Sequence, residues 1–203
     1  MKKIIILSIV FLLITVNAGA ETLQLRADYL NWVGNNIELR DNIEIIRDDI
    51  RVTALRGKYN RTKKEMDLKE EIIMDYEQGK ITSFQLRALL ESNLYIFEDE
   101  VVFSQIRDNV SFVLKAPFLE LDQNQDFFIA RQGVSIDYNG RQLQAEEADY
   151  QEETATLTLL NNVYIEEENG DWIKGDKAIF YLDEEEETFI VKGKVEVEIN
   201  IGF

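Results

Sequence analysis

Residues 143–150 read LQAEEADY, and the alternation of apolar residues changes phase in the middle of this stretch. Leu143 and Ala145 share one parity along the chain, whereas Ala148 and Tyr150 share the other. A straight strand would send those two pairs to opposite faces of a sheet. Small residues at the third and sixth positions allow a bend or bulge that returns both pairs to one face. The stretch therefore predicts a bent β-strand.

The same eight-residue pattern occurs at three other places in the chain. These are VTALRGKY at 52–59, LKAPFLEL at 114–121 and IKGDKAIF at 173–180. A second pattern, an apolar–x–apolar pair, recurs at spacings of 29, 29, 33, 29 and 32 residues. Its members are Ile43/Ile45, Ile72/Met74, Val101/Phe103, Val134/Ile136, Val163/Ile165 and Val195/Val197. A period of this kind indicates a repeat protein.

Within each repeat, the apolar residues alternate with polar ones, as in residues 155–159 and 195–201. This period of two is typical of strands with one buried face, and polar turns such as NRTKK and DQNQD separate the strands. The sequence predicts an all-β fold of about six strand–turn–strand repeats. Their bent strands wrap around a common interior and form two facing antiparallel sheets. In the third repeat, residues 83–93 are also compatible with a short helix behind a Ser83 cap.

Composition excludes several function classes. The 203 residues include 22 Lys+Arg and 39 Asp+Glu, a net charge of −17, and such a surface repels nucleic acid. The chain has no cysteine and no histidine, which excludes thiol and imidazole catalysis and ordinary zinc sites. Asp122, Asn124 and Asp126 resemble the start of a calcium loop, but the glycine and the final glutamate of that loop are missing. We expect no catalytic residue, no metal and no cofactor.

The first twenty residues have the layout of a secretory signal peptide. Two lysines precede the apolar run 4–16, and the small residues Ala18-Gly19-Ala20 follow it. The run is shorter than the ~20 residues that span a bilayer. We therefore expect cleavage after Ala20 and an exported domain at 21–203, and a retained anchor is the alternative.

The motifs DNIEI (41–45), QGVSI (132–136), NNVYI (161–165) and GKVEV (193–197), together with the eight-residue pattern, resemble the OstA-like (LptA-like) family. The resemblance covers residues 21–203. It implies a V-shaped β-jellyroll in the periplasm whose apolar interior holds acyl chains. It also implies lipopolysaccharide or a similar amphipathic lipid as the ligand. The partners that it implies are other jellyroll proteins of a transport bridge, and head-to-tail self-association is a further expectation.

If the apolar pairs line a groove, their side chains contact the acyl chains. The expected lining residues are Ile43, Ile45, Val134, Ile136, Val163, Ile165, Val195 and Val197. A stack filled by its own side chains gives the same sequence pattern. Two functions of different classes therefore remain. One is a carrier that passes lipopolysaccharide-type glycolipid toward the outer membrane, and the other is a structural β-repeat module without a ligand.

Overall fold

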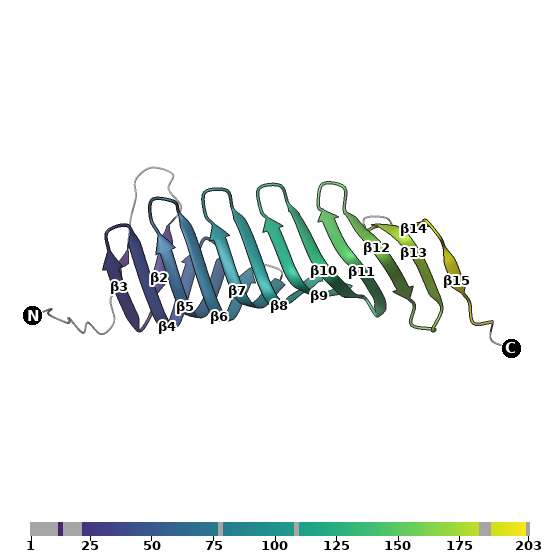
Figure 1. The fold of residues 1–203 in the computed structure, drawn as a ribbon, viewed down its shortest axis with the longest axis horizontal. Coiled ribbons are helices and arrows are strands. Elements are labelled where there is room, and N and C mark those ends of the chain that lie inside the picture. Colours follow the sequence, from purple (N-terminus) through teal and green to yellow (C-terminus); the bar gives the residue numbers. More distant parts are fainter. Residues whose placement is uncertain (1–11, 14–21, 77–78, 108–109, 183–187, 202–203) are drawn as a thin grey trace, which may run out of the picture.

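The computed structural model describes residues 12–13, 22–76, 79–107, 110–182 and 188–201, and these residues form one antiparallel sheet of 15 strands (Figure 1). The strands are β1 (Leu12–Leu13), β2 (Leu23–Arg26), β3 (Tyr29–Val33), β4 (Asn36–Arg47), β5 (Ile50–Asn60), β6 (Glu65–Tyr76), β7 (Gly79–Leu89), β8 (Leu94–Arg107), β9 (Val110–Asp122), β10 (Phe127–Tyr138), β11 (Arg141–Gln151), β12 (Thr156–Glu166), β13 (Trp172–Tyr181), β14 (Thr188–Lys192) and β15 (Glu196–Glu198). The all-β fold predicted from the sequence is confirmed.

From β4 to β14 each strand pairs with the next along the chain, which makes a long meander. At the start, β2 and β3 pair with different parts of β4; at the end, β14 and β15 pair with different parts of β13. The result is an elongated stack with β3 at one end of its long axis and β15 at the other (Figure 1).

A bulge bends each long strand near its centre. On β4, Asp41 and Asn42 both have positive φ, and together they stand opposite the single residue Leu55 of β5. Such a two-against-one arrangement kinks a strand. Asn and Asp adopt the left-handed conformation more readily than other non-glycine residues. The corresponding pairs on β6, β8, β10 and β12 are Glu70/Glu71, Asp99/Glu100, Gln132/Gly133 and Asn161/Asn162.

The bulges divide the sheet into two facing halves. Arm A consists of 43–47, 50–54, 72–76, 79–83, 101–106, 110–116, 134–138, 141–145, 163–166 and 172–175, with β2 and β15. Arm B consists of 36–40, 56–60, 65–69, 85–89, 94–98, 118–122, 127–131, 147–151, 156–160 and 177–181, with β3 and β14. The two facing sheets expected from the sequence are thus halves of one folded sheet. Their inner side chains form a single hydrophobic core.

The predicted change of parity is confirmed on β11. Leu143 and Ala145 are buried on arm A, and Ala148 is buried on arm B after the register shift. The third repeat follows the same rule, because Ser83 and Leu86 are both buried on the strand β7. The alternative of a helix at 83–93 is therefore wrong. The buried Ser83 hydroxyl donates a hydrogen bond of 2.9 Å to the Gln85 carbonyl, which satisfies it at the bend.

Of the predicted signal peptide, the structure describes Leu12 and Leu13, which form β1 beside β2. The expected cleavage site after Ala20 lies outside the described residues. The described residues include no helix that is long and apolar enough to span a membrane.

Candidate functional site

Six of the eight expected lining residues lie together on the inner face of arm A. Ile43, Ile45, Val134, Ile136, Val163 and Ile165 are all buried in the core. The other two lie at the end of the stack and are exposed: Val195 by 47% and Val197 by 52%. Val197 pairs with Ile173 on β13, so it continues the same inner row beyond the buried part.

Arm B supplies the other half of the interior. Its largest fully buried side chains include Leu39, Leu68, Phe97, Leu119 and Phe180. None of these residues was among the expected lining residues, although Leu119 and Phe180 belong to the second half of the eight-residue pattern and the alternation in residues 155–159 marks the inner face of one arm B strand. They belong to strand parts on the other side of the bulges from the apolar pairs. The apolar pairs therefore supply only one wall of the interior, which is the inner face of arm A.

The two walls are packed against each other. A cavity of about 20 Å³ lies between them near the N-terminal end, where Ile45 and Val52 of arm A meet Met66, Leu86 and Tyr95 of arm B. A water molecule needs roughly 10–15 Å³ by the same kind of measure. This space therefore accommodates at most about one water molecule, not an acyl chain.

Aromatic side chains close the edge of the V that lies opposite the bulges. We call this set the mouth cluster: Tyr76, Phe103 and Phe112 on arm A, and Phe128 and Tyr150 on arm B. The rings of Phe103 and Phe128 meet edge to face with centroids 5.6 Å apart, and those of Phe112 and Phe128 are 6.1 Å apart. Edge-to-face contacts at this distance are attractive. The arms are therefore joined at the mouth by ring contacts, and no strand pairing links them there among the residues that the structure describes.

The environment of Tyr76, a member of the mouth cluster, changes the chemistry of its phenol. Burial raises the pKa of the Tyr76 phenol above its ordinary value of 10.0, and the negative charge of Glu152 raises this pKa further. Both effects oppose ionisation of the phenol. The Tyr76 phenol is consequently neutral over the whole physiological pH range.

Both ends of the stack expose apolar side chains of the inner face. At the N-terminal end, Leu30 and Trp32 on β3 pair with the buried Leu39 and Ile37, yet they are 37% and 38% exposed. The guanidinium of Arg61 covers the Trp32 ring at 4.7 Å. At the C-terminal end, Ile199 and Ile201 continue the exposed row of Val195 and Val197. The apolar interior thus reaches the surface at both ends.

No group of three or more acidic side chains among the described residues is arranged to hold a metal ion. The interior is lined almost entirely by hydrocarbon, and the one buried polar residue of the described core is Ser83. This chemistry suits the binding of apolar groups.

Comparison with known proteins identifies the fold and no family. No protein-family model matches the chain, and no curated protein matches it. Among solved structures, the chain is similar to LptH from Pseudomonas aeruginosa, described as the LptA homologous periplasmic component of the conserved lipopolysaccharide transport device. The two are 10% identical, with a TM-score of 0.51, over 75% of this chain and 95% of LptH. The LptA-like fold predicted from the sequence is confirmed by this likeness.

Proposed function

We propose that this chain is a lipid-carrying component of a periplasmic bridge that moves a lipopolysaccharide-type glycolipid toward the outer membrane. One observation carries the proposal: the chain shares the bent-strand stack of LptH over nearly all of that protein, and its apolar interior reaches the surface at both ends. An export signal at residues 1–20 and a periplasmic location belong to the same proposal.

The acyl chains would enter between the arms at the mouth cluster. Because the walls touch in this structure, entry requires the arms to separate at the mouth cluster. The bulges, at the opposite edge of the arms, would be the hinge of this motion. Separation breaks ring contacts such as Phe103–Phe128, and within the described part of the chain it breaks no strand pairing between the arms. Each methylene buried by the protein contributes ~0.8 kcal/mol, so an acyl chain can replace the contacts that the walls lose. The lining residues on arm A are those expected from the sequence, including Ile45 and Ile165.

The partners would be other jellyroll proteins or further copies of this chain, stacked end to end. In the described residues, β3 ends arm B at one end of the stack and β14 ends it at the other, each with one unpaired edge. Unpaired strand edges accept strands from other chains. Stacking would also cover the exposed inner residues Trp32 and Val197. An uninterrupted apolar path through successive molecules would follow.

A structural module without a ligand is the second candidate, and the packed interior favours it. Six of the eight expected lining residues are buried by protein alone. Such a module would use the same ends for assembly and would keep its arms closed.

Lipid capture separates the two candidates. The purified chain would be incubated with lipopolysaccharide, recovered by size exclusion, and analysed for bound fatty acids by mass spectrometry. We expect fatty acids with the wild type and more with Phe128→Ala, because that change weakens the mouth. Phe84→Ala, at a ring exposed on the bend, is the control and should match the wild type. Absence of fatty acid in all three samples would contradict the carrier and favour the structural module.

A further inference from the structure

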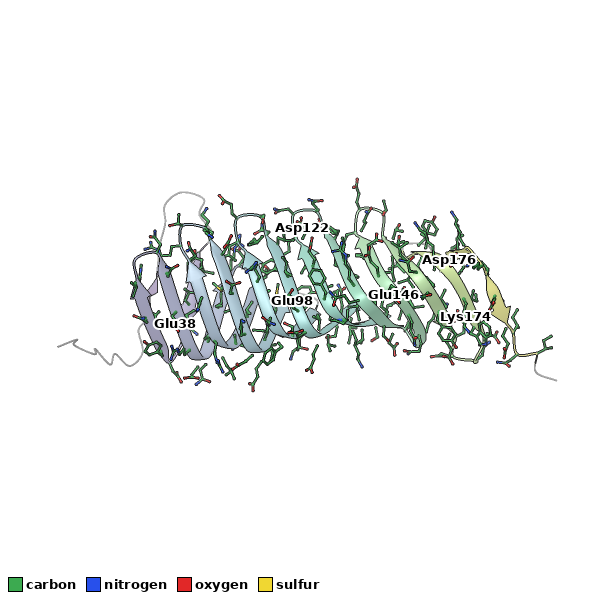
Figure 2. All side chains as sticks on the ribbon, viewed as in Figure 1. Glu38, Glu98, Asp122, Glu146, Lys174 and Asp176 are labelled. Atoms are coloured by element: carbon green, nitrogen blue, oxygen red, sulfur yellow. The ribbon has the colours of Figure 1, made fainter. Side chains whose placement is uncertain are left out.

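The outer face of arm B carries a hollow that the proposed lipid path does not use. Its volume is about 950 Å³, and it extends across the strands from β4 to β9. This volume falls within the range of small-molecule sites, roughly 300–1,000 Å³. Glu38 on β4 and Glu98 on β8, both labelled in Figure 2, border it. We call this feature the outer hollow.

Five cationic side chains line the outer hollow beside four carboxylates, those of Glu38, Asp41, Asp67 and Glu98, although the chain as a whole has a net charge of −17. The cationic residues are Arg40, Arg56, Lys58, Lys69 and Arg87. The strand register sets three of them directly side by side: Arg40 pairs with Arg56, and Arg56 pairs with Lys69. We call these three residues the cation row. Like charges directly opposite each other destabilise an antiparallel pair, so folding alone does not favour this row.

Carboxylates compensate the row only in part. Arg40 binds Glu38 at 2.8 Å, and Arg56 binds Glu70 at 2.7 Å. Arg87 on β7, which stands opposite Asp67 and not opposite Lys69, forms an ion pair with Asp67 at 3.0 Å. In contrast, Lys69 forms no ion pair with any described residue, although it stands opposite Arg56. Positive charge is therefore left over at the β6 end of the row.

We propose that the cation row binds a compact anion with two or more phosphate groups, free in solution. The two guanidinium groups offer planar forks that match phosphate oxygens, and the lysine adds a point charge. The row spans two strand spacings, about 10 Å. Several linked phosphates can bridge that span, whereas one carboxylate neutralises a single cation. The driving force is the attraction of the phosphate groups for the row, in which the charge of Lys69 is not compensated by a carboxylate.

The site is independent of the proposed lipid path. The cation row lies beside the bulges at 41–42 and 70–71, on the outer surface and at the opposite end of the strand parts from the mouth cluster. A lipid with its acyl chains between the arms would have its head group at the mouth and could not reach the row. The lipid proposal and this one can therefore fail separately.

The test is isothermal titration of the whole chain with sodium tripolyphosphate at low ionic strength. We expect saturable binding by the wild type and a loss of about tenfold or more in affinity for Lys69→Gln, which removes one charge-assisted contact. The matched control is Arg131→Gln, which removes one positive charge from the same outer face of arm B but leaves the row complete. It should bind like the wild type.

A second measurement does not depend on binding by the variant. Without the anion, Lys69→Gln should unfold at the same or a higher temperature than the wild type, because it relieves repulsion. Tripolyphosphate should raise the unfolding temperature of the wild type more than that of Lys69→Gln. The proposal is overturned if the wild type does not bind, if the two variants lose affinity equally, or if a polyglutamate peptide binds as tightly. Binding to vesicles of a phosphate-bearing lipid without binding to free tripolyphosphate would also overturn it.

Discussion

Phe128→Ala tests directly whether the two arms touch at the mouth. Phe128 is 5% exposed and contacts three rings, those of Phe103, Phe112 and Tyr150. Burial of such a side chain contributes about 1.5–3 kcal/mol. Each aromatic pair adds about 0.5–1.5 kcal/mol beyond that burial. Phe→Ala changes in cores cost about 3–5 kcal/mol, and we expect the free energy of unfolding to fall by that amount.

The assay is urea unfolding followed by far-UV circular dichroism, with the denaturant slope compared between variants. An unchanged slope would show that the midpoint shift reflects stability and not a different denatured state. Phe84→Ala is the control because its ring is 48% exposed, and its effect should stay within about 0.5 kcal/mol. Equal losses for the two variants, or a loss below about 1 kcal/mol for Phe128→Ala, would mean that the arms are not held together by these rings.

Three further changes test other parts of the structure. Gly133 has φ +91° in the bulge of β10, so Gly133→Val should cost about 1–3 kcal/mol in urea unfolding, and an unaffected variant would contradict a fixed bulge there. The raised pKa of Tyr76 means that its stabilising contribution is present below pH ~10 and is lost as the pH rises above that value, so Tyr76→Phe should lose less stability than the wild type in alkali. Equal alkaline loss would exclude this role. Val197→Pro on β15 should reduce concentration-dependent association in sedimentation experiments, and a wild type that stays monomeric at high concentration would refute end-to-end stacking.

The bent strand could be predicted because its cause is local. The parity change in LQAEEADY is a property of eight residues, and the structure places its bend between Ala145 and Ala148. The bulge residues were harder to identify from the sequence. Asn42 and Asn162 look like the first residues of a repeat, but they lie in the middle of a strand. At Glu70 and Glu71 the same backbone conformation occurs without a residue type that favours it. There the register of neighbouring strands decides the bend.

The site could be predicted only as far as the choice of inner face. Alternation shows that Ile165 points inward, but it does not show how closely the opposite wall approaches. That distance depends on side chains from both arms, such as Phe103 and Phe128, which are close only in the folded sheet. The cation row was missed for a similar reason. Arg40, Arg56 and Lys69 lie on three successive strands, and only the register makes them neighbours.

The measurement that tests the lipid-carrier account most directly is site-specific photo-crosslinking. An aliphatic diazirine residue would be placed at position 165, which is buried on the inner face, or at position 166, which lies on the outer face of the same strand. Each labelled chain, with its fold verified by circular dichroism, would then be irradiated with lipopolysaccharide. The account predicts strong lipid labelling from position 165 and little from position 166. Equal labelling from both positions, or none from either, would contradict it and identify the interior as a permanently closed core.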